Sequence, residues 1–361
     1  MWHRTIFRRQ FLALTAAASI GLILNPTRSV FPQEVLPPAG VPVSSTYPET
    51  SAQLQIGDPS QFRIMQLTDT HLFQPRDIPN TDQRSLREWK EMVARYKPDL
   101  IVITGDVWYN NNLDTEDEAL MRKSVDWLSS LGVPWAFVWG NHDRMKNYPM
   151  GHDLFHNAQG SLYRGGSSSG NYTVEVTGPD GRRVWEIICL NTNTVELTQN
   201  WLKKLAAQRA GSADTNPFIF AFFHIPLRQF ARLAGNDTTA GIIIEGIGHG
   251  GLDRESFEIM KSLGRLRACF CGHLHKNDCS GIVDGVELVY GRSSGWTAHG
   301  WVEVRKGAKL ITANCATGGY RWETVFPDGT RWHPKSGEKI TAIVNKPWMQ
   351  DPAKPALAPV P

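Results

Sequence analysis

The sequence predicts an α/β fold, in which helices cover a layered β-sheet of mixed strand pairing. Between residues 61 and 315, short apolar runs alternate with segments of helical periodicity. One pair of runs flanks a turn sequence, which adds antiparallel pairing to an otherwise parallel pattern. An apolar fraction of 41%, with 13 Trp, is ample for a core. We therefore expect one domain over residues 61–345.

The first half of this region contains three short apolar runs, FRIMQL, LIVIT and WAFVW. They are strand-length and are separated by two longer amphipathic segments, the second of which ends at Gly132. The expected elements are strand 62–67, helix 82–96, strand 100–104, helix 115–132 and strand 135–139.

The second half begins with the runs YTVEV and VWEIICL, which flank GPDG and predict a hairpin. The segments LTQNWLKKLAAQRA and RESFEIMKSLG predict helices, and FIFAFF and RACF predict strands. The expected elements are the hairpin 172–176 and 184–190, helix 197–210, strand 218–223, helix 254–264, strand 267–270, and strands near 286–290, 300–304 and 308–314.

The two ends of the chain have different compositions from this domain. Residues 1–30 place Arg8 and Arg9 before a 14-residue uncharged run, Phe11–Leu24, which resembles a twin-arginine export signal. An ordinary secretory signal or a membrane anchor remains an alternative, because no clean small-x-small cleavage site follows. Residues 31–60 indicate a Pro/Ser-rich linker, and residues 346–361 a Pro/Ala-rich tail. We expect export to the periplasm, with membrane contact only through an uncleaved signal segment.

The net charge of +3 comes from the first 30 residues, which contain four Arg and no acid. Without these four, the 38 basic residues become 34, against 35 acidic residues. A nearly neutral domain lacks the basic surface typical of nucleic-acid binding. We therefore expect a small-molecule substrate and no nucleic-acid partner.

Polar side chains follow five of the expected strands. In open α/β sheets, ligands bind at the carboxyl ends of the strands. Each short sequence alone has an ordinary explanation as a turn or a structural histidine, but five at five strand ends point to one site. The residues are Asp69, His71, Asp106, Asn141, His142, Asp143, His224, His273 and His275.

Seven of these residues form a ligand set of two Asp, four His and one Asn, without a thiolate. Carboxylate and imidazole together suit Mn, Fe, Co or Zn, and argue against a structural zinc–cysteine site or a calcium site. Seven ligands are too many for one tetrahedral ion, but suit two ions that share a carboxylate. Two metal ions can stabilise the attacking and leaving oxygens of a phosphoryl transfer. The set therefore predicts a phosphoesterase.

The same sequences resemble the ordered motifs of calcineurin-like metallophosphoesterases over roughly residues 61–315. They are Asp69-x-His71, Gly105-Asp106, Gly140-Asn141-His142-Asp143, His224 and Gly272-His273-x-His275. The segments FFHIPLRQF, GHLHKNDCSG and VYGRSSGWTAHGW further resemble the purple-acid-phosphatase-like branch. The resemblance implies a two-sheet mixed β sandwich flanked by helices.

The resemblance also implies roles for the individual residues. Asp69, His71 and His275 would hold one metal ion, and Asn141, His224 and His273 the other. Asp106 would bridge the two transition-metal ions, with a bridging hydroxide as the nucleophile. His142 would donate to the phosphate or the leaving oxygen, and Asp143 would orient it.

One feature departs from true purple acid phosphatases. GDVWY contains Tyr109 where those enzymes have an iron-ligating tyrosine, but this chain has His71 at the position that such a ligand would need. We expect Tyr109 to pack or line the pocket, and the protein to show no tyrosinate-to-iron absorption band.

Several alternatives remain open. A metal-binding module without catalysis is compatible with the same fold. A serine esterase would depend on GSSSG at 166–170, which precedes a strand rather than linking a strand to a helix. His299 could line the pocket or pack between aromatic residues. The ligand set does not choose between phosphomonoesters and phosphodiesters.

Overall fold

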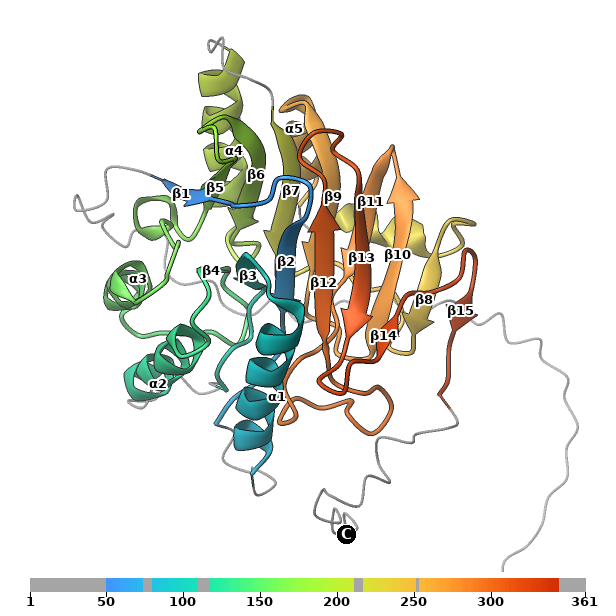
Figure 1. Ribbon diagram of the computed structural model, residues 1–361. Coiled ribbons are helices and arrows are strands. Elements are labelled where there is room, and N and C mark those ends of the chain that lie inside the picture. The colour runs from blue at the N-terminus through green and yellow to red at the C-terminus, as the bar shows by residue number, and fades with distance from the viewer. Residues whose placement is uncertain (1–49, 74–79, 110–116, 211–216, 251–252, 344–361) are drawn as a thin grey trace, which may run out of the picture. The chain divides into compact units, whose positions relative to one another are not determined.

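Two β-sheets form the body of the structure, with helices on their outer sides (Figure 1). The computed structural model describes residues 50–73, 80–109, 117–210, 217–250 and 253–343. Both sheets belong to one compact unit within residues 33–361. The α/β class and the two-sheet architecture are thereby confirmed. The expected signal segment, 1–30, and tail, 346–361, lie outside the described residues.

The larger sheet, sheet A, has nine strands of mixed direction in the order β1-β5-β6-β7-β9-β11-β10-β8-β15. β6, β7 and β9 are parallel neighbours, whereas β5 and β6 form the expected antiparallel hairpin. The strands are β1 (Ser51–Gln55), β5 (Tyr172–Thr177), β6 (Arg183–Leu190), β7 (Phe218–Phe223), β8 (Ala240–Ile243), β9 (Arg265–Cys271), β10 (Asn277–Val283), β11 (Val286–Tyr290) and β15 (Lys339–Ile340).

The smaller sheet, sheet B, has six strands in the order β14-β13-β12-β2-β3-β4. Its β2, β3 and β4 are parallel, and β12 pairs antiparallel with β2. The strands are β2 (Phe62–Leu67), β3 (Leu100–Ile103), β4 (Trp135–Phe137), β12 (Ala308–Ala313), β13 (Tyr320–Val325) and β14 (Arg331–Trp332).

In the part of the chain that the structure describes, five α-helices lie on the outer sides of the sheets (Figure 1). Helix α1 ends where Lys97 adopts a left-handed conformation and donates to the carbonyl of Val93, immediately before Pro98. Among the residues described, no helix is both long and apolar enough to cross a membrane. The helices are α1 (Thr81–Tyr96), α2 (Asp117–Ser129), α3 (Tyr148–Asn157), α4 (Val195–Ala210) and α5 (Ser256–Ser262).

Strand β7 shows how the sequence FIFAFF serves two hydrophobic cores. Phe220 and Phe222 belong to the core that includes sheet B, whereas Ala221 and Phe223 belong to a second core with α4 and α5. Successive side chains of a strand point to opposite faces, so a strand buried on both faces is apolar throughout.

A buried ionic network ties the two sheets together. Asp278 of β10 accepts hydrogen bonds from Lys309 of β12 and Thr324 of β13, and also from Arg292. All four side chains are buried. Because each charge has an oppositely charged partner, the network avoids the cost of an isolated buried ion.

Two sequence predictions about boundaries were wrong. Ser51–Gln55, expected as linker, forms β1 and pairs with β5. Residues 300–304, expected as a strand, form a turn in which the N–H groups of Glu303 and Val304 bond to Gly300, whose φ is 86°. The alternating pattern GWVEV does not reveal this turn. Strands β8, β10, β13, β14 and β15 and helix α3 were not anticipated.

The aromatic core around α3 contains a histidine that must remain neutral. The hydroxyl of Tyr163 accepts the indole N–H of Trp139 at 2.8 Å and lies 2.6 Å from Nδ1 of His152. A neutral ring can accept the hydroxyl proton at this nitrogen. Burial lowers the pKa of His152 to about 4.

This histidine predicts an acid-sensitive contribution to stability. Its pKa is lower in the folded protein than the ordinary value of 6.5. The stability is therefore present above pH 6.5 and is lost as the pH falls toward 4. We expect the advantage of wild type over His152→Gln to shrink by about 2 kcal/mol between about pH 7 and 4.5. Urea unfolding at both pH values measures this difference, and a pH-independent difference would contradict it.

Candidate metal centre

The carboxyl ends of five core strands bring the candidate ligands to one place. β2, β3 and β4 are parallel neighbours in sheet B, as are β7 and β9 in sheet A. Each strand is followed by loop residues with ligating side chains. These are Asp69 and His71 after β2, Asp106 after β3, Asn141 after β4, His224 after β7, and His273 and His275 after β9.

The loops bend sharply at the candidate ligands themselves. Asp69, His71, Asp106 and His273 all have positive φ, between 44° and 78°. This left-handed conformation is strained for residues other than glycine and often occurs at functional sites. Here it turns the chain immediately after a buried strand and directs the side chains into a shared cluster.

Two glycines allow the loops to approach one another. A Cβ on Gly140 would lie 2.2 Å from the backbone nitrogen of Asp106, and a Cβ on Gly272 would lie 2.1 Å from Oγ1 of Thr68. No side chain fits at these distances. The glycines before Asn141 and His273 are therefore required for the site to close.

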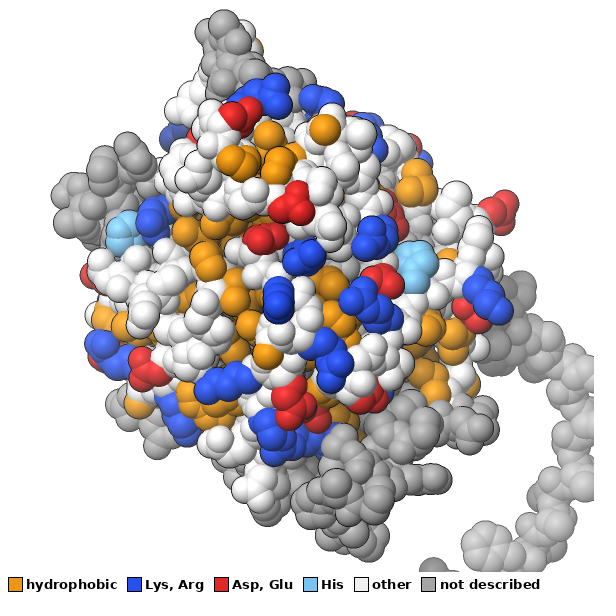
Figure 2. All heavy atoms as spheres, in the orientation of Figure 1, with side chains coloured by type: hydrophobic (Ala, Val, Ile, Leu, Met, Phe, Trp, Pro, Cys, Tyr) orange, Lys and Arg blue, Asp and Glu red, His pale blue; other side chains and the backbone are white. Residues whose placement is uncertain are grey.

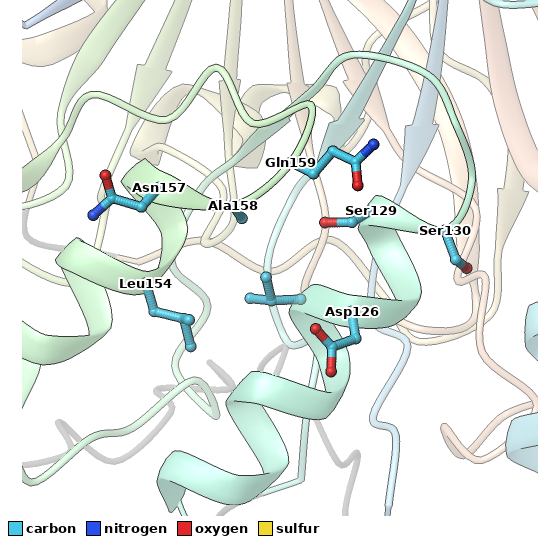
Figure 3. Close-up of a pocket in the computed structure, with 8 residues that line it drawn as sticks. Asp126, Ser129, Ser130, Leu154, Asn157, Ala158 and Gln159 are labelled. Carbon is cyan, nitrogen blue, oxygen red and sulfur yellow. The ribbon is translucent and has the colours of Figure 1, made fainter.

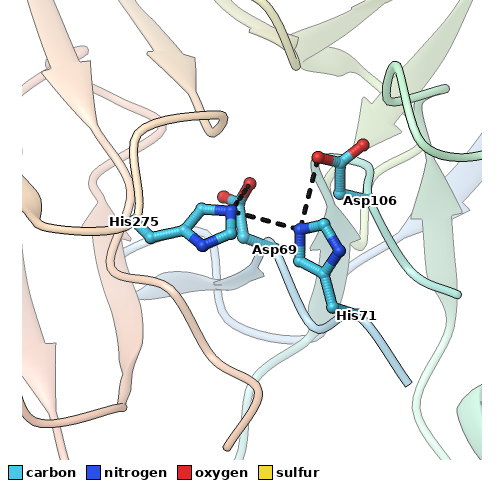
Figure 4. A group of neighbouring side chains, drawn as sticks. All are labelled: Asp69, His71, Asp106 and His275. Carbon is cyan, nitrogen blue, oxygen red and sulfur yellow. Dashed lines mark hydrogen bonds and ion pairs between the residues drawn. The ribbon is translucent and has the colours of Figure 1, made fainter. Parts of the chain in front are cut away.

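The first group of potential ligands consists of Asp69, His71, Asp106 and His275 (Figure 4). Their ligating atoms lie within 4.8 Å of one another, and all four residues are buried. His71 Nε2 is 3.1 Å from His275 Nε2 and 3.4 Å from Asp106 Oδ2. His275 Nε2 is 3.3 Å from Asp69 Oδ1.

The second group consists of Asp106, His224 and His273. His224 Nε2 lies 3.1 Å from Asp106 Oδ2, 3.3 Å from His273 Nδ1 and 3.0 Å from Asn141 Oδ1. Asn141 therefore joins this group through His224. Oxygen Oδ2 of Asp106 faces both groups, which places this carboxylate between them.

The ionisation of the cluster leaves ligand atoms available. Burial lowers the pKa of His273 to about 4 and that of His275 to about 3, so both rings are neutral at pH 7. Burial also favours neutral His224 and Asp106, but their mutual attraction raises the pKa of His224 to about 9 and holds that of Asp106 well below its usual range. A cation that binds there replaces the His224 proton.

The donor set fits transition-metal ions. Imidazoles and carboxylates converge in each group, and such a convergence is stabilised by a cation among the donors. The second nitrogen of His224 lies 2.7 Å from the carbonyl of Thr104, which orients the ring as is usual for metal ligands. Among the described residues, Nδ1 of His71 and of His275 are buried without a hydrogen-bond partner.

Asp143 holds the backbone of this centre, which differs from the role expected for it. Its carboxylate accepts the backbone N–H groups of Gly140 and Asp106 at 2.8 Å and of Val107 at 2.7 Å. Asp143 therefore clamps two loops together, and the orientation of His142 by Asp143 stays a prediction. Burial, aided by the negative Asp106, raises the pKa of Asp143 to about 7.

His142 lies beside the first group. Its ring centroid is 5.0 Å from that of His71, and its backbone N–H donates to Asp106 Oδ1 at 2.9 Å. The ring is half-buried, and burial lowers its pKa. It is therefore close enough to the cluster to contact a bound ester.

Residues 166–168 of the GSSSG segment form a short 3₁₀ turn before β5, as expected for a loop. Tyr109, which we expect not to be a ligand, is half-buried. A separate hollow of about 400 Å³ lies between α2 and α3 (Figure 3), and none of its lining residues belongs to the cluster.

The role of the residues that support the ligands was not predicted from the sequence. Thr68 donates from Oγ1 to Asp69, and Ser293 donates to the carbonyl of Asp69. Buried Lys306 donates in turn to Ser293. Ser293 and Lys306 are distant in sequence from every ligand, so no short motif indicates that they support the site.

The comparison with protein-family models identifies the chain. The model described as calcineurin-like phosphoesterase matches residues 62–277. The Arabidopsis thaliana protein named Probable inactive purple acid phosphatase 28 is 26% identical over 322 residues, which cover 75% of this chain and 80% of that protein. Another Arabidopsis protein, Probable inactive purple acid phosphatase 14, is 24% identical over 327 residues, covering 76% and 80%.

A solved structure described as a dimetal phosphatase from Danio rerio is 13% identical, with a TM-score of 0.45, and covers 71% of this chain and 96% of that one. The family match spans all five strand ends that supply the cluster, and every candidate ligand from Asp69 to His275. The chain belongs to the calcineurin-like phosphoesterase family, and its relatives include purple-acid-phosphatase-like proteins.

Proposed function

We propose that this protein is a phosphoric ester hydrolase that depends on two transition-metal ions. The observation that carries the proposal is the position of Asp106 Oδ2, which lies 3.4 Å from His71 Nε2 in one group and 3.1 Å from His224 Nε2 in the other. One shared carboxylate between two sets of donors is the arrangement required by a pair of ions.

The residues divide between the two ions as the geometry groups them. Asp69, His71 and His275 hold one ion with Asp106, and Asn141, His224 and His273 hold the other with Asp106. Manganese, iron, zinc and cobalt suit these nitrogen and oxygen ligands. Bound ions of this type supply a water nucleophile near neutral pH and positive charge that stabilises the phosphoryl oxygens.

His142 acts on the ester itself. Its ring lies beside His71, and its backbone N–H fixes the orientation of the Asp106 carboxylate. From this position the imidazole donates a hydrogen bond to a phosphoryl oxygen or to the leaving oxygen as negative charge develops there. Asp143 contributes indirectly, because it holds the loops that carry Asp106 and Asn141.

The substrate class follows from charge as well as from the site. On the face shown in Figure 2, basic side chains lie interspersed with acidic ones. Together with the nearly neutral composition, this supports a small phosphomonoester or phosphodiester rather than a nucleic acid. The twin-arginine-type segment supports export to the periplasm.

A metal-binding module without catalysis is the second candidate. The observation in its favour is that two relatives are named as inactive phosphatases. In this chain, however, the described cluster contains both carboxylates, all four imidazoles and His142. The two candidates differ in turnover, although both predict metal binding.

Metal reconstitution tests the proposal. The protein is stripped with a chelator, reloaded with Mn, Fe, Zn or Co, and assayed with a nitrophenyl phosphomonoester and a bis-nitrophenyl phosphodiester. We expect at least one metal to restore hydrolysis, and chelation to abolish it again. The preferred ester then identifies the substrate class.

The same experiment separates the alternatives. Two bound ions without turnover on either ester would favour the binding module. Activity that survives the chelator would favour a serine esterase, for which Ser167→Ala and Ser168→Ala would be the next variants. A visible tyrosinate-to-iron band in the iron-loaded protein would contradict the expectation that Tyr109 is not a ligand.

A further inference from the structure

His299 presents an exposed imidazole beside the metal centre. Its side chain is 64% exposed, yet its ring centroid lies 3.9 Å from that of His275, with the two planes inclined by 34°. A side chain open to solvent therefore packs on the ring of a candidate metal ligand. This position suits contact with a substrate better than a role in the core.

The backbone of His299 is held by a buried charge. Nζ of Lys306 donates at 2.8 Å both to the carbonyl of His299 and to Oγ of Ser293, and Ser293 in turn donates to the carbonyl of Asp69. Both acceptors of Lys306 are uncharged, so burial of its ammonium group is poorly compensated. The lysine therefore connects the His299 backbone, through Ser293, to the loop that carries Asp69.

Helix α1 fixes the preceding part of the same loop. Nε1 of Trp296 donates to Glu88 at 2.7 Å, and its backbone N–H donates to Oγ of Ser85 at 2.9 Å. Oγ1 of Thr297 donates to Asp82 at 2.7 Å. The position of His299 is therefore set by contacts on both sides of it in the sequence.

Glu245 is the acidic partner of this histidine. Its Oε1 lies 3.5 Å from Nε2 of His299, and its Oε2 accepts the backbone N–H of Lys276, the residue after His275, at 3.1 Å. Although burial favours the neutral acid, these two contacts hold the pKa of Glu245 below its ordinary value. The side chain remains 28% exposed.

Glu245 and His299 lie at the edge of the metal centre, which we call the rim. The negative charge of Glu245 is the feature of this rim that a substrate would meet. Two other charged residues there, Lys276 and Glu303, pair with each other at 3.0 Å. A carboxylate near the site attracts a cationic group of a bound ester and repels an anionic one, and partial burial reduces screening by salt.

We propose that Glu245 and His299 form a charge-selective rim that favours phosphoesters with a neutral or cationic alcohol group over those with further negative charge. The proposal rests on the phosphoester site proposed above. Within it, the metal centre binds the phosphoryl group and the rim receives the alcohol part.

Two non-hydrolysable probes of similar size test the rim by binding alone. 2-Aminoethylphosphonate carries a cationic group, whereas phosphonoacetate carries a second anionic group. Isothermal titration calorimetry on the metal-loaded full chain gives both dissociation constants. We expect wild type to prefer 2-aminoethylphosphonate, and Glu245→Gln to reduce the ratio of the two constants by roughly tenfold.

Each probe also contacts the ions directly, and this contribution is the same in every variant. Comparing the ratio of the two dissociation constants between variants therefore removes it. Glu323→Gln is the matched control, because Glu323 of β13 is 24% exposed and pairs with Arg331 of β14. It should leave the ratio unchanged. His299→Phe keeps a ring against His275 but removes the contact that positions Glu245, and should therefore reduce the ratio by a smaller factor than Glu245→Gln.

The outcomes separate this inference from the proposed function. An unchanged ratio in Glu245→Gln, equal weakening of both probes, or no binding of either probe to wild type would overturn the rim. Selective binding without hydrolysis of any ester would retain the rim and remove the hydrolase. Hydrolysis of an ester together with an unchanged ratio in Glu245→Gln would retain the hydrolase and remove the rim.

Discussion

Asp106→Asn is expected to release both metal ions rather than one, and to reduce ester hydrolysis by at least about 10³-fold. The reason is geometric. Oxygen Oδ2 of Asp106 faces His71 in one group and His224 in the other, so no other side chain in the cluster belongs to both. An amide at this position removes the negative charge that balances two cations.

Single-group variants are the control for this prediction. His275→Ala affects only the first group, and His273→Ala affects only the second. After dialysis, elemental analysis should find two ions in wild type, one in each histidine variant and none in Asp106→Asn. Retention of one tightly bound ion by Asp106→Asn would show that the carboxylate serves a single site.

The ligand positions could be predicted from sequence because they follow strands that are easy to recognise. FRIMQL, LIVIT and FIFAFF are short, apolar and buried, and Asp69, Asp106 and His224 come directly after them. The carboxyl ends of parallel strands meet at one edge, so the assignment of strands was enough to bring these residues together.

The contacts that orient the ligands could not be predicted in the same way. Lys306 and Glu245 are far from every ligand in sequence. The turn at Gly300 brings the loop of Lys306 to His275, and the pairing of β8 with β10 brings Glu245 there. The resemblance to a family suggested that Asp143 orients His142, which stays a prediction. The bonds of Asp143 to backbone N–H groups leave no trace in a pattern of side chains.

The peripheral strands were missed for a related reason. β1 and β15 lie at the edges of sheet A and are five and two residues long. Such segments carry little periodicity, and their pairing with β5 and β8 depends on distant parts of the chain. Central strands such as β3 and β7 were recognised because both of their faces are apolar, whereas the buried strand β10 was missed because its sequence, NDCSGIV, begins with polar residues.

Asp143→Ala is expected to weaken both metal ions by about 10- to 100-fold each, although Asp143 belongs to neither group of ligands. Loss of the carboxylate leaves the N–H groups of Gly140, Asp106 and Val107 without their acceptor. Three buried donors left unpaired should lower the free energy of unfolding by about 3–5 kcal/mol. Asp106 would then lose its strained backbone position, and both ions depend on it.

Asp143→Asn separates positioning from simple destabilisation. Its amide oxygen can still accept the two N–H groups of Asp106 and Gly140, so it should keep most of the metal affinity while losing the bond to Val107. Asp253→Ala is the matched control, because Asp253 is also buried and accepts the backbone N–H groups of Glu255 and Ser256 before α5. It should lower stability without changing metal affinity. If calorimetric titrations show equal metal affinities for Asp143→Ala and Asp253→Ala, the clamp is structural only, and Asp106 keeps its position through the loop glycines and the parallel strands beneath them.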